Sequence, residues 1–113
     1  NPEKERYFDV ELIKNKIKKL YKDENKINII LYNELTAKIS KKLNANFILR
    51  GLRNTTDFEF ENSISQINKD INKNLETVFL ITSPKLAPIS STIIRDVIKY
   101  GGNINKYLPY KIN

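Results

Sequence analysis

Three short runs of apolar residues constrain the fold of this chain more than any other feature. They cover residues 27–31, 47–49 and 77–81, and they are rich in Ile, Leu, Val and Phe. Each run is continuously apolar instead of alternating apolar with polar residues. That pattern is typical of strands buried on both faces of a parallel sheet. Because segments with helical spacing separate the runs, the sequence predicts an α/β fold.

Apolar residues recur at helical spacing in four segments. We expect helices over residues 10–22, 35–43, 57–72 and 90–100, of which the third has its apolar stripe at Phe60, Ile64, Ile67 and Ile71. Asp9 is expected to cap the first helix, and Gly101 to end the last. Gly51 is expected to end the second strand. The length fits a single domain, residues 1–113.

The ends of the predicted strands are where a ligand is expected. Right-handed crossovers between parallel strands place ligands beyond the carboxyl ends of the strands. The candidate loops are residues 32–36, 50–56 and 82–90. Two groups of residues in these loops carry chemistry that suits an anion.

The first group is Arg50 and Arg53, which flank Gly51. Only four of the 20 basic residues are Arg, and two of them stand here. A guanidinium is a planar fork of donors that suits phosphate oxygens, and glycine lets the backbone approach a ligand closely. The alternative is a surface ion-pair cluster, which the local sequence does not exclude. Its acidic partners would be Asp57, Glu59 or Glu61.

The second group is Ser90, Ser91 and Thr92 at the start of the last helix, with Arg95 following. Hydroxyl groups beside the free N–H groups of a helix start make a phosphate site. The alternative is that one Ser only caps the helix. Lys4 is either a phosphate-binding charge or a solvated side chain. Glu61 either holds a ribose or water, or favours the helix electrostatically.

Composition excludes several other kinds of site. Cys and His are both absent, which excludes disulfides, Cys-based zinc sites and imidazole chemistry by this chain. No run of about 18 apolar residues predicts a membrane span, and the cytosol is the expected compartment. The net charge of +7 is consistent with a Lys-rich solvated surface or with an anionic partner.

Residues 47–61 resemble the "RGLR…DFEYE" signature of bacterial phosphopantetheine adenylyltransferases, which belong to the nucleotidyltransferase superfamily. The run Glu-Thr-Val-Phe-Leu at 76–80 and the Ile-Ser-Ser-Thr start at 89–92 resemble two further motifs of that family. Asn1-Pro2-Glu3-Lys4 and Gly101-Gly102 resemble the motifs near its two ends. The resemblance runs over nearly the whole chain.

The resemblance implies a Rossmann-like parallel sheet with flanking helices and a reaction of coenzyme A synthesis. Enzymes of the family transfer an adenylyl group from ATP to 4′-phosphopantetheine, which yields dephospho-CoA and pyrophosphate. Mg²⁺ accompanies the ATP, and the subunits assemble as hexamers. Neither a membrane nor a nucleic acid is an implied partner.

The resemblance also implies roles for individual residues. Lys4, Thr36 and Arg50 would bind phosphopantetheine. The ATP site would comprise Gly51, Leu52, Arg53, Glu61, Leu86, Ala87, Pro88, Ile89, Ser90, Ser91 and Thr92. Leu86, Ala87 and Pro88 stand where the family often has aromatic residues.

The family's "GTFDPxxxGH" segment, which carries its catalytic His, has no counterpart here. The chain opens on Asn1 and not on Met. We therefore expect a first strand-helix unit upstream, and little activity from residues 1–113 alone. Two alternatives stay open. One is another nucleotidyltransferase of the superfamily, and the other is a non-catalytic, basic nucleic-acid-binding module.

Overall fold

A computed structural model describes residues 7–111 of the chain. Its contacts divide the chain into two compact units. The central unit is Glu34–Pro88, and the terminal unit comprises Asn1–Asn33 and Ile89–Asn113. The expectation of one domain over residues 1–113 stays a prediction.

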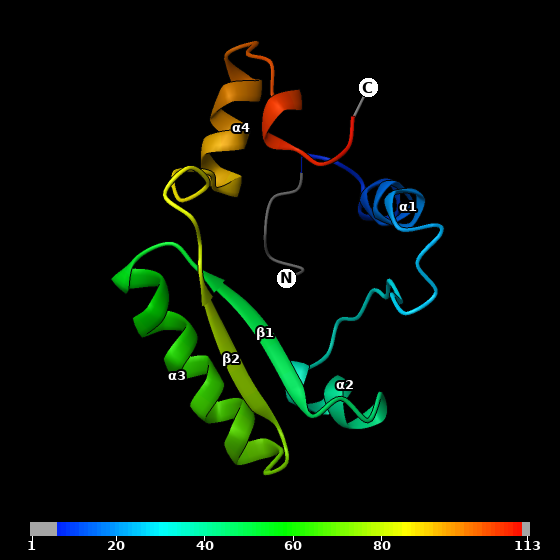
Figure 1. The fold of residues 1–113 in the computed structure, drawn as a ribbon, viewed down its shortest axis with the longest axis vertical. Coiled ribbons are helices and arrows are strands. Elements are labelled where there is room, and N and C mark those ends of the chain that lie inside the picture. The colour runs from blue at the N-terminus through cyan, green and yellow to red at the C-terminus, as the bar shows by residue number, and fades with distance from the viewer. Residues whose placement is uncertain (1–6, 112–113) are drawn as a thin grey trace. The chain divides into compact units, whose positions relative to one another are not determined.

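The central unit is built around two parallel strands and the helix that connects them. Strands β1 (Phe47–Leu52) and β2 (Glu76–Ile81) pair in register from Phe47 opposite Glu76 to Leu52 opposite Ile81. Helix α3 (Thr55–Ile71) follows β1 and runs alongside both strands (Figure 1). The predicted α/β fold with a parallel sheet and flanking helices is therefore confirmed.

The prediction of a strand at residues 27–31 is wrong. The structure assigns no strand there, and its sheet contains only β1 and β2 within the described residues. A strand exists through hydrogen bonds to a neighbouring strand, and a β-branched apolar run supplies only a preference for that state. No strand among residues 7–111 pairs with this segment, so it has no ladder to join.

Gly51 does not end the second strand as predicted, because β1 continues through it to Leu52. Its partner in the ladder is Leu80. A Cβ atom at this position would lie 3.8 Å from the Thr82 Oγ1 atom, which is an ordinary contact. The strand geometry therefore does not require a glycine here, and close approach of a ligand to Gly51 stays a prediction.

Helix α3 begins two residues earlier than predicted because Asn54 caps it. The Asn54 Oδ1 atom accepts a hydrogen bond from the Asp57 N–H at 2.8 Å. Asn is among the preferred N-cap residues, since its side chain satisfies one of the unpaired N–H groups of the first turn. The helix is joined to the sheet by an edge-on contact between Phe58 and Phe79, with ring centroids 5.9 Å apart.

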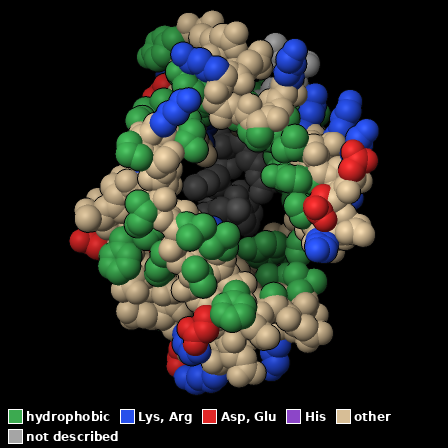
Figure 2. Space-filling model, viewed as in Figure 1, with side chains coloured by type: hydrophobic (Ala, Val, Ile, Leu, Met, Phe, Trp, Pro, Cys, Tyr) green, Lys and Arg blue, Asp and Glu red, His purple; other side chains and the backbone are tan. Residues whose placement is uncertain are grey.

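The predicted apolar stripe of α3 does not form part of the core of the central unit. Its side chains are exposed, with Phe60 67% and Ile67 62% accessible, and many apolar side chains lie at the surface of the molecule (Figure 2). The half-buried polar residues Ser65 and Asn68 lie on other positions of the helix. The periodicity of apolar residues predicts which face of a helix packs against another surface, but it does not identify that surface.

Helix α2 (Thr36–Lys42) confirms the second predicted helix, and it packs against α3. Ala37 is buried, and the buried Ser40 hydroxyl donates to the Ala37 carbonyl at 2.9 Å. The Asn72 side chain donates in turn to the Ser40 oxygen at 3.3 Å. Leu75, in the turn between α3 and β2, is the largest fully buried side chain among residues 7–111.

In the terminal unit, helix α1 (Val10–Leu20) begins where the sequence predicts. The Asp9 carboxylate accepts from the Glu11 N–H at 2.8 Å and from the Leu12 N–H at 3.1 Å. These bonds confirm Asp9 as the cap of the helix.

The last predicted helix is α4 (Ser91–Lys99), and a short 3₁₀ helix, η1 (Asn105–Tyr107), follows it. Gly101 has a φ of 73°, and its N–H donates to the Ile98 carbonyl at 2.9 Å. The Gly102 N–H donates to the Val97 carbonyl at 2.7 Å. This is the Schellman end of a helix, which confirms that the two glycines stop α4.

None of the helices in the part of the chain that the structure describes combines the length and apolar character needed to cross a membrane.

Candidate functional site

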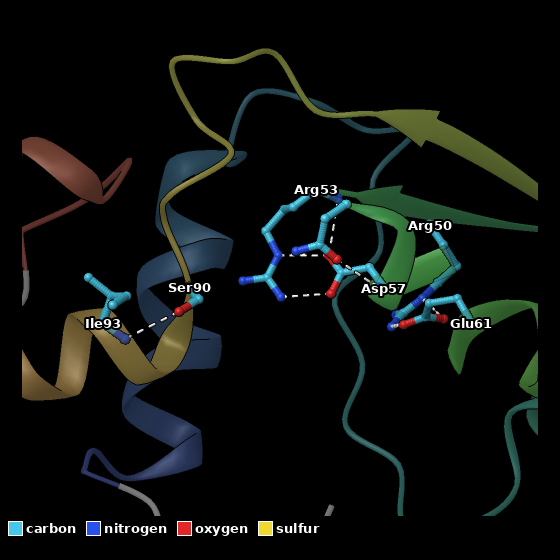
Figure 3. Close-up of polar contacts among 7 residues, drawn as sticks. Arg50, Arg53, Asp57, Glu61, Ser90 and Ile93 are labelled. Atoms are coloured by element: carbon cyan, nitrogen blue, oxygen red, sulfur yellow. Dashed lines mark hydrogen bonds and ion pairs between the residues drawn. The ribbon is translucent and has the colours of Figure 1, made fainter. Parts of the chain in front are cut away.

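Arg50 lies on β1 and reaches across to α3, where it is paired with Glu61. The Arg50 Nε atom donates to the Glu61 Oε2 atom at 2.8 Å, and Nη2 makes a second bond to Oε1 (Figure 3). The Glu61 side chain is only 12% exposed. A carboxylate that is largely withdrawn from water and held on both oxygens fixes the direction of the arginine.

Arg53 follows β1 directly and is paired with Asp57 in the first turn of α3. The Asp57 Oδ2 atom accepts from both the backbone N–H and the Nε of Arg53, at 3.0 and 2.8 Å. The Oδ1 atom accepts from Nη2 at 2.9 Å (Figure 3). One carboxylate therefore holds both the main chain and the side chain of Arg53.

The two ion pairs are the cluster that the sequence left open as an alternative to a phosphate site. They involve Asp57 and Glu61, and Glu59 forms no ion pair with any other residue of the range 7–111. An ion pair does not by itself exclude a ligand, because a guanidinium has more donors than one carboxylate uses. The pairing therefore shows how the arginines are held, while their use for phosphate stays a prediction.

The pairing has an electrostatic consequence for Asp57. The hydrogen bonds from the Arg53 side chain and backbone lower the pKa of the Asp57 carboxyl from 3.8 to about 2. The same pair raises the pKa of Arg53 above its usual value. Both groups are therefore charged at every physiological pH.

Replacing Arg53 with Gln is expected to return the pKa of Asp57 from about 2 toward its usual 3.8. The lowered pKa means that the pair stabilises the fold fully above about pH 4 and loses this effect as the pH falls toward 2. Titration of the side-chain carboxyl carbons by NMR measures the pKa directly. An Asp57 pKa that the substitution leaves unchanged contradicts this account.

The loop after β2 starts beside the end of β1. The Thr82 N–H donates to the Leu52 carbonyl at 2.8 Å, which extends the pairing of the two strands by one bond. The N–H groups of Leu86 and Ala87 then donate to the Ser83 carbonyl, at 2.9 and 3.0 Å, and fold the loop into a turn. The carboxyl ends of both strands are thus at one edge of the sheet, as the sequence predicts.

The predicted residues at the start of α4 belong to the terminal unit. The Ser90 Oγ atom accepts from the Ile93 N–H at 3.2 Å, so Ser90 caps the helix (Figure 3). The Arg95 Nη2 atom donates to the Thr92 hydroxyl at 3.2 Å. Capping accounts for Ser90, whereas phosphate binding by Ile89, Ser90, Ser91 and Thr92 stays a prediction.

The remaining predicted residues have different surroundings. Thr36 is the first residue of α2 and is half-buried. The Leu52 side chain is buried, so the group it presents at the sheet edge is its backbone. Pro88 is exposed at the end of the central unit. Lys4 lies outside the described residues.

Reasoning from sequence missed how Asn54 and Asp57 act together. Asn54 caps α3 through the Asp57 N–H, and this places the Asp57 carboxylate beside Arg53. The signal was present, because Asn three residues before an acidic residue resembles a capping box. It was missed because the helix was predicted to begin at residue 57, which is too late for Asn54 to be its cap.

Residues 7–111 do not form a metal site by themselves. In the part of the chain that the structure describes, no group of three or more His, Cys, Asp or Glu residues could hold a metal ion. The two carboxylates nearest the candidate site, Asp57 and Glu61, are already bound to arginines. The arrangement therefore suits an anion better than a metal ion, because it places two guanidinium groups at the carboxyl edge of a parallel sheet.

Comparisons with known proteins show the family to which the chain belongs. The model of the cytidylyltransferase-like family matches residues 1–97. A phosphopantetheine adenylyltransferase of Cytophaga hutchinsonii is 52% identical over 112 residues, covering 99% of this chain and 75% of the relative. The enzyme of that name from Flavobacterium johnsoniae is 46% identical over 96% of this chain and 71% of its own length. The one from Bacteroides thetaiotaomicron is 38% identical, over 96% and 72%. The chain belongs to the cytidylyltransferase-like nucleotidyltransferases and, among them, to the phosphopantetheine adenylyltransferase family.

Proposed function

We propose that the protein transfers an adenylyl group from ATP to 4′-phosphopantetheine and releases pyrophosphate. The product is dephospho-CoA, an intermediate of coenzyme A synthesis. The observation that carries the proposal is the pair Arg50 and Arg53 at the carboxyl end of β1, in a chain of this family. Two cations a few residues apart suit a reaction between two phosphate-bearing substrates.

The reaction needs no covalent enzyme intermediate, so the main task of the protein is to position the two substrates. An oxygen of the phosphopantetheine phosphate attacks the α-phosphorus of ATP, and the bond to the bridging oxygen of pyrophosphate breaks. Both reactants are anions, so they must be held together against their repulsion. Arg50 would hold the acceptor phosphate and Arg53 the phosphates of ATP. Charge stabilisation by such groups lowers the barrier.

The remaining residues are proposed to complete the two subsites. Lys4 and Thr36 would contact phosphopantetheine beside Arg50. Backbone groups of Gly51 and Leu52 would approach the nucleotide, and Glu61 would orient Arg50 while lining the ATP site. Leu86, Ala87, Pro88, Ile89, Ser90, Ser91 and Thr92 would wrap the nucleotide, and the turn at Ser83 supports this for the first of them.

Mg²⁺ is proposed to enter with ATP and not as a resident ion. The described residues offer no cluster of metal ligands, so phosphate oxygens and water would supply most of the coordination. Chelation with EDTA should stop the reaction, and added Mg²⁺ should restore it. Turnover that continues in excess EDTA contradicts this part of the proposal.

The test of the function is an assay of the protein expressed from its complete coding sequence. Incubation with ATP and 4′-phosphopantetheine should yield dephospho-CoA and pyrophosphate in equal amounts. Nicotinamide mononucleotide and glycerol phosphate serve as control acceptors, which separate this reaction from those of other nucleotidyltransferases. Product from a control acceptor at the same rate, or no product at all, overturns the proposal.

We also propose that the protein forms a homo-oligomer, which by family resemblance is a hexamer. We propose a cytoplasmic location, because ATP and the intermediates of coenzyme A synthesis are used there. The support for an oligomer is the exposed apolar stripe of α3. Monomeric proteins rarely leave such a stripe in water, and copies of one chain commonly cover it.

Replacing Ile67 with Lys is expected to shift the protein to a smaller species in analytical ultracentrifugation. The 62% exposed side chain would place a charge in the proposed interface between copies, where it would be desolvated. The control is Gln66→Lys, which adds the same charge to the neighbouring exposed position of α3. Equal effects of the two substitutions, or none, contradict a subunit contact at the stripe.

A further inference from the structure

Asp57 has no assigned part in the reaction, yet its carboxylate accepts three hydrogen bonds from Arg53, a predicted phosphate-binding residue. We propose that Asp57 is a positioning residue: it holds Arg53 by one edge, so that the other edge of the guanidinium binds a phosphate group of ATP. This inference rests on the proposed function.

The hydrogen bonds of Arg53 leave a complete fork of donors. A guanidinium has one fork between Nε and one Nη, and a second between Nη1 and Nη2. Asp57 occupies the Nε and Nη2 atoms. Within the described part of the central unit, Nη1 and the second hydrogen of Nη2 bond to no other residue. A phosphate can therefore bind Arg53 bidentately without displacing Asp57.

Asp57 is itself held in place by local structure. Its N–H is bonded to the Asn54 cap, and its carboxylate bonds the Arg53 N–H. The side chain is 21% exposed and sits in the first turn of α3, where a negative charge is favourable. Because the end of β1 and the start of α3 are tied together here, the direction of the Arg53 side chain is set before a ligand arrives. Such preorganisation removes part of the entropy cost of binding.

The alternative is that Asp57 competes with ATP for Arg53. In that case ATP would have to pull Arg53 away from Asp57, and removal of the carboxylate would strengthen ATP binding. The geometry favours positioning, because the bonds to Asp57 include the Arg53 backbone N–H, which cannot leave with the side chain. The two uses predict opposite signs for one measurement.

That measurement is ATP affinity by isothermal titration calorimetry in the Asp57→Asn protein, prepared from its complete coding sequence. Asn keeps the size of the side chain but turns an NH₂ group or a neutral oxygen toward the guanidinium. We expect ATP binding to weaken about tenfold, as for the loss of one charged hydrogen bond. The KM for ATP should rise while the KM for 4′-phosphopantetheine stays unchanged. Unchanged or tighter ATP binding overturns the proposal.

Glu59→Gln is the matched control. Glu59 lies on the same helix, is exposed and makes no ion pair in the described structure, so this change removes one negative charge without touching Arg53. It should leave the ATP affinity within about twofold of the wild type. A loss of affinity equal to that of Asp57→Asn shows that the effect is not specific to the carboxylate that holds Arg53, and overturns the proposal.

A second measurement does not depend on any substitution. The chain has only four Arg, so the ¹⁵Nε signals of its side chains can be resolved. Binding of ATP should shift the Nη signals of Arg53 while its Nε–H, bonded to Asp57, stays protected from exchange. Loss of that protection on ATP binding shows that the pair opens, and overturns the proposal even if a variant is unstable.

The outcomes separate this inference from the proposed reaction. ATP binding that depends on Asp57, in a protein that makes no dephospho-CoA, refutes the reaction alone. Normal dephospho-CoA synthesis by Asp57→Asn with unchanged ATP binding refutes the positioning role alone.

Discussion

Replacing Arg50 or Arg53 with Gln is expected to reduce kcat/KM for adenylyl transfer about a hundredfold or more, because each change removes a charged group from a reaction between anions. The two substitutions should affect different substrates. Arg50→Gln should chiefly raise the KM for 4′-phosphopantetheine, and Arg53→Gln that for ATP. Both arginines are held by carboxylates of α3, so their directions are set in the free protein. Steady-state kinetics with each substrate varied in turn measures the division.

Two further variants show whether the geometry or only the charge matters. Arg53→Lys keeps the charge but cannot bridge Asp57 and a phosphate as a fork does, so it should recover only a small part of the activity. Lys73→Gln is the control, because it removes an exposed cation that pairs with Asp70 near the far end of α3. Full activity in Arg53→Lys, or a comparable loss in Lys73→Gln, contradicts a bidentate role for Arg53.

Replacing Leu75 with Ala is expected to lower the free energy of unfolding by about 3 kcal/mol, the usual range for a buried leucine that leaves a cavity. Leu75 is 1% exposed and is the largest fully buried side chain of the described chain. Its N–H also bonds the Asn72 carbonyl at 2.9 Å, which fixes the turn between α3 and β2. Urea denaturation of the two proteins measures the difference.

The control for this change is Leu43→Ala. Leu43 belongs to the same central unit but is 50% exposed at the end of α2. The same chemical change there should cost no more than about 1 kcal/mol, since much of the side chain already contacts water. Equal losses at the two positions contradict the view that Leu75 anchors the unit.

Local patterns were sufficient to predict the elements of this chain that are decided within a few residues. Asp9 and Ser90 cap helices because their oxygen atoms reach N–H groups two or three positions away. Gly101 stops α4 because a glycine adopts a positive φ at little cost, and a Cβ atom at Gly102 would lie only 2.6 Å from the Val97 Cγ1 atom. The continuous apolar runs of β1 and β2 predicted a parallel pair, and motif resemblance identified the family.

The sequence by itself therefore determined the fold class, the family and which arginines to examine. Tertiary structure alone decided that residues 27–31 form no strand, since a strand depends on a partner that no local pattern specifies. The tertiary structure also decided that Arg53 pairs with Asp57 and Arg50 with Glu61, although Glu59 lies nearby in the sequence. That choice depends on the direction in which α3 leaves β1, because the length and angle of an ion pair are set by the positions of two backbones.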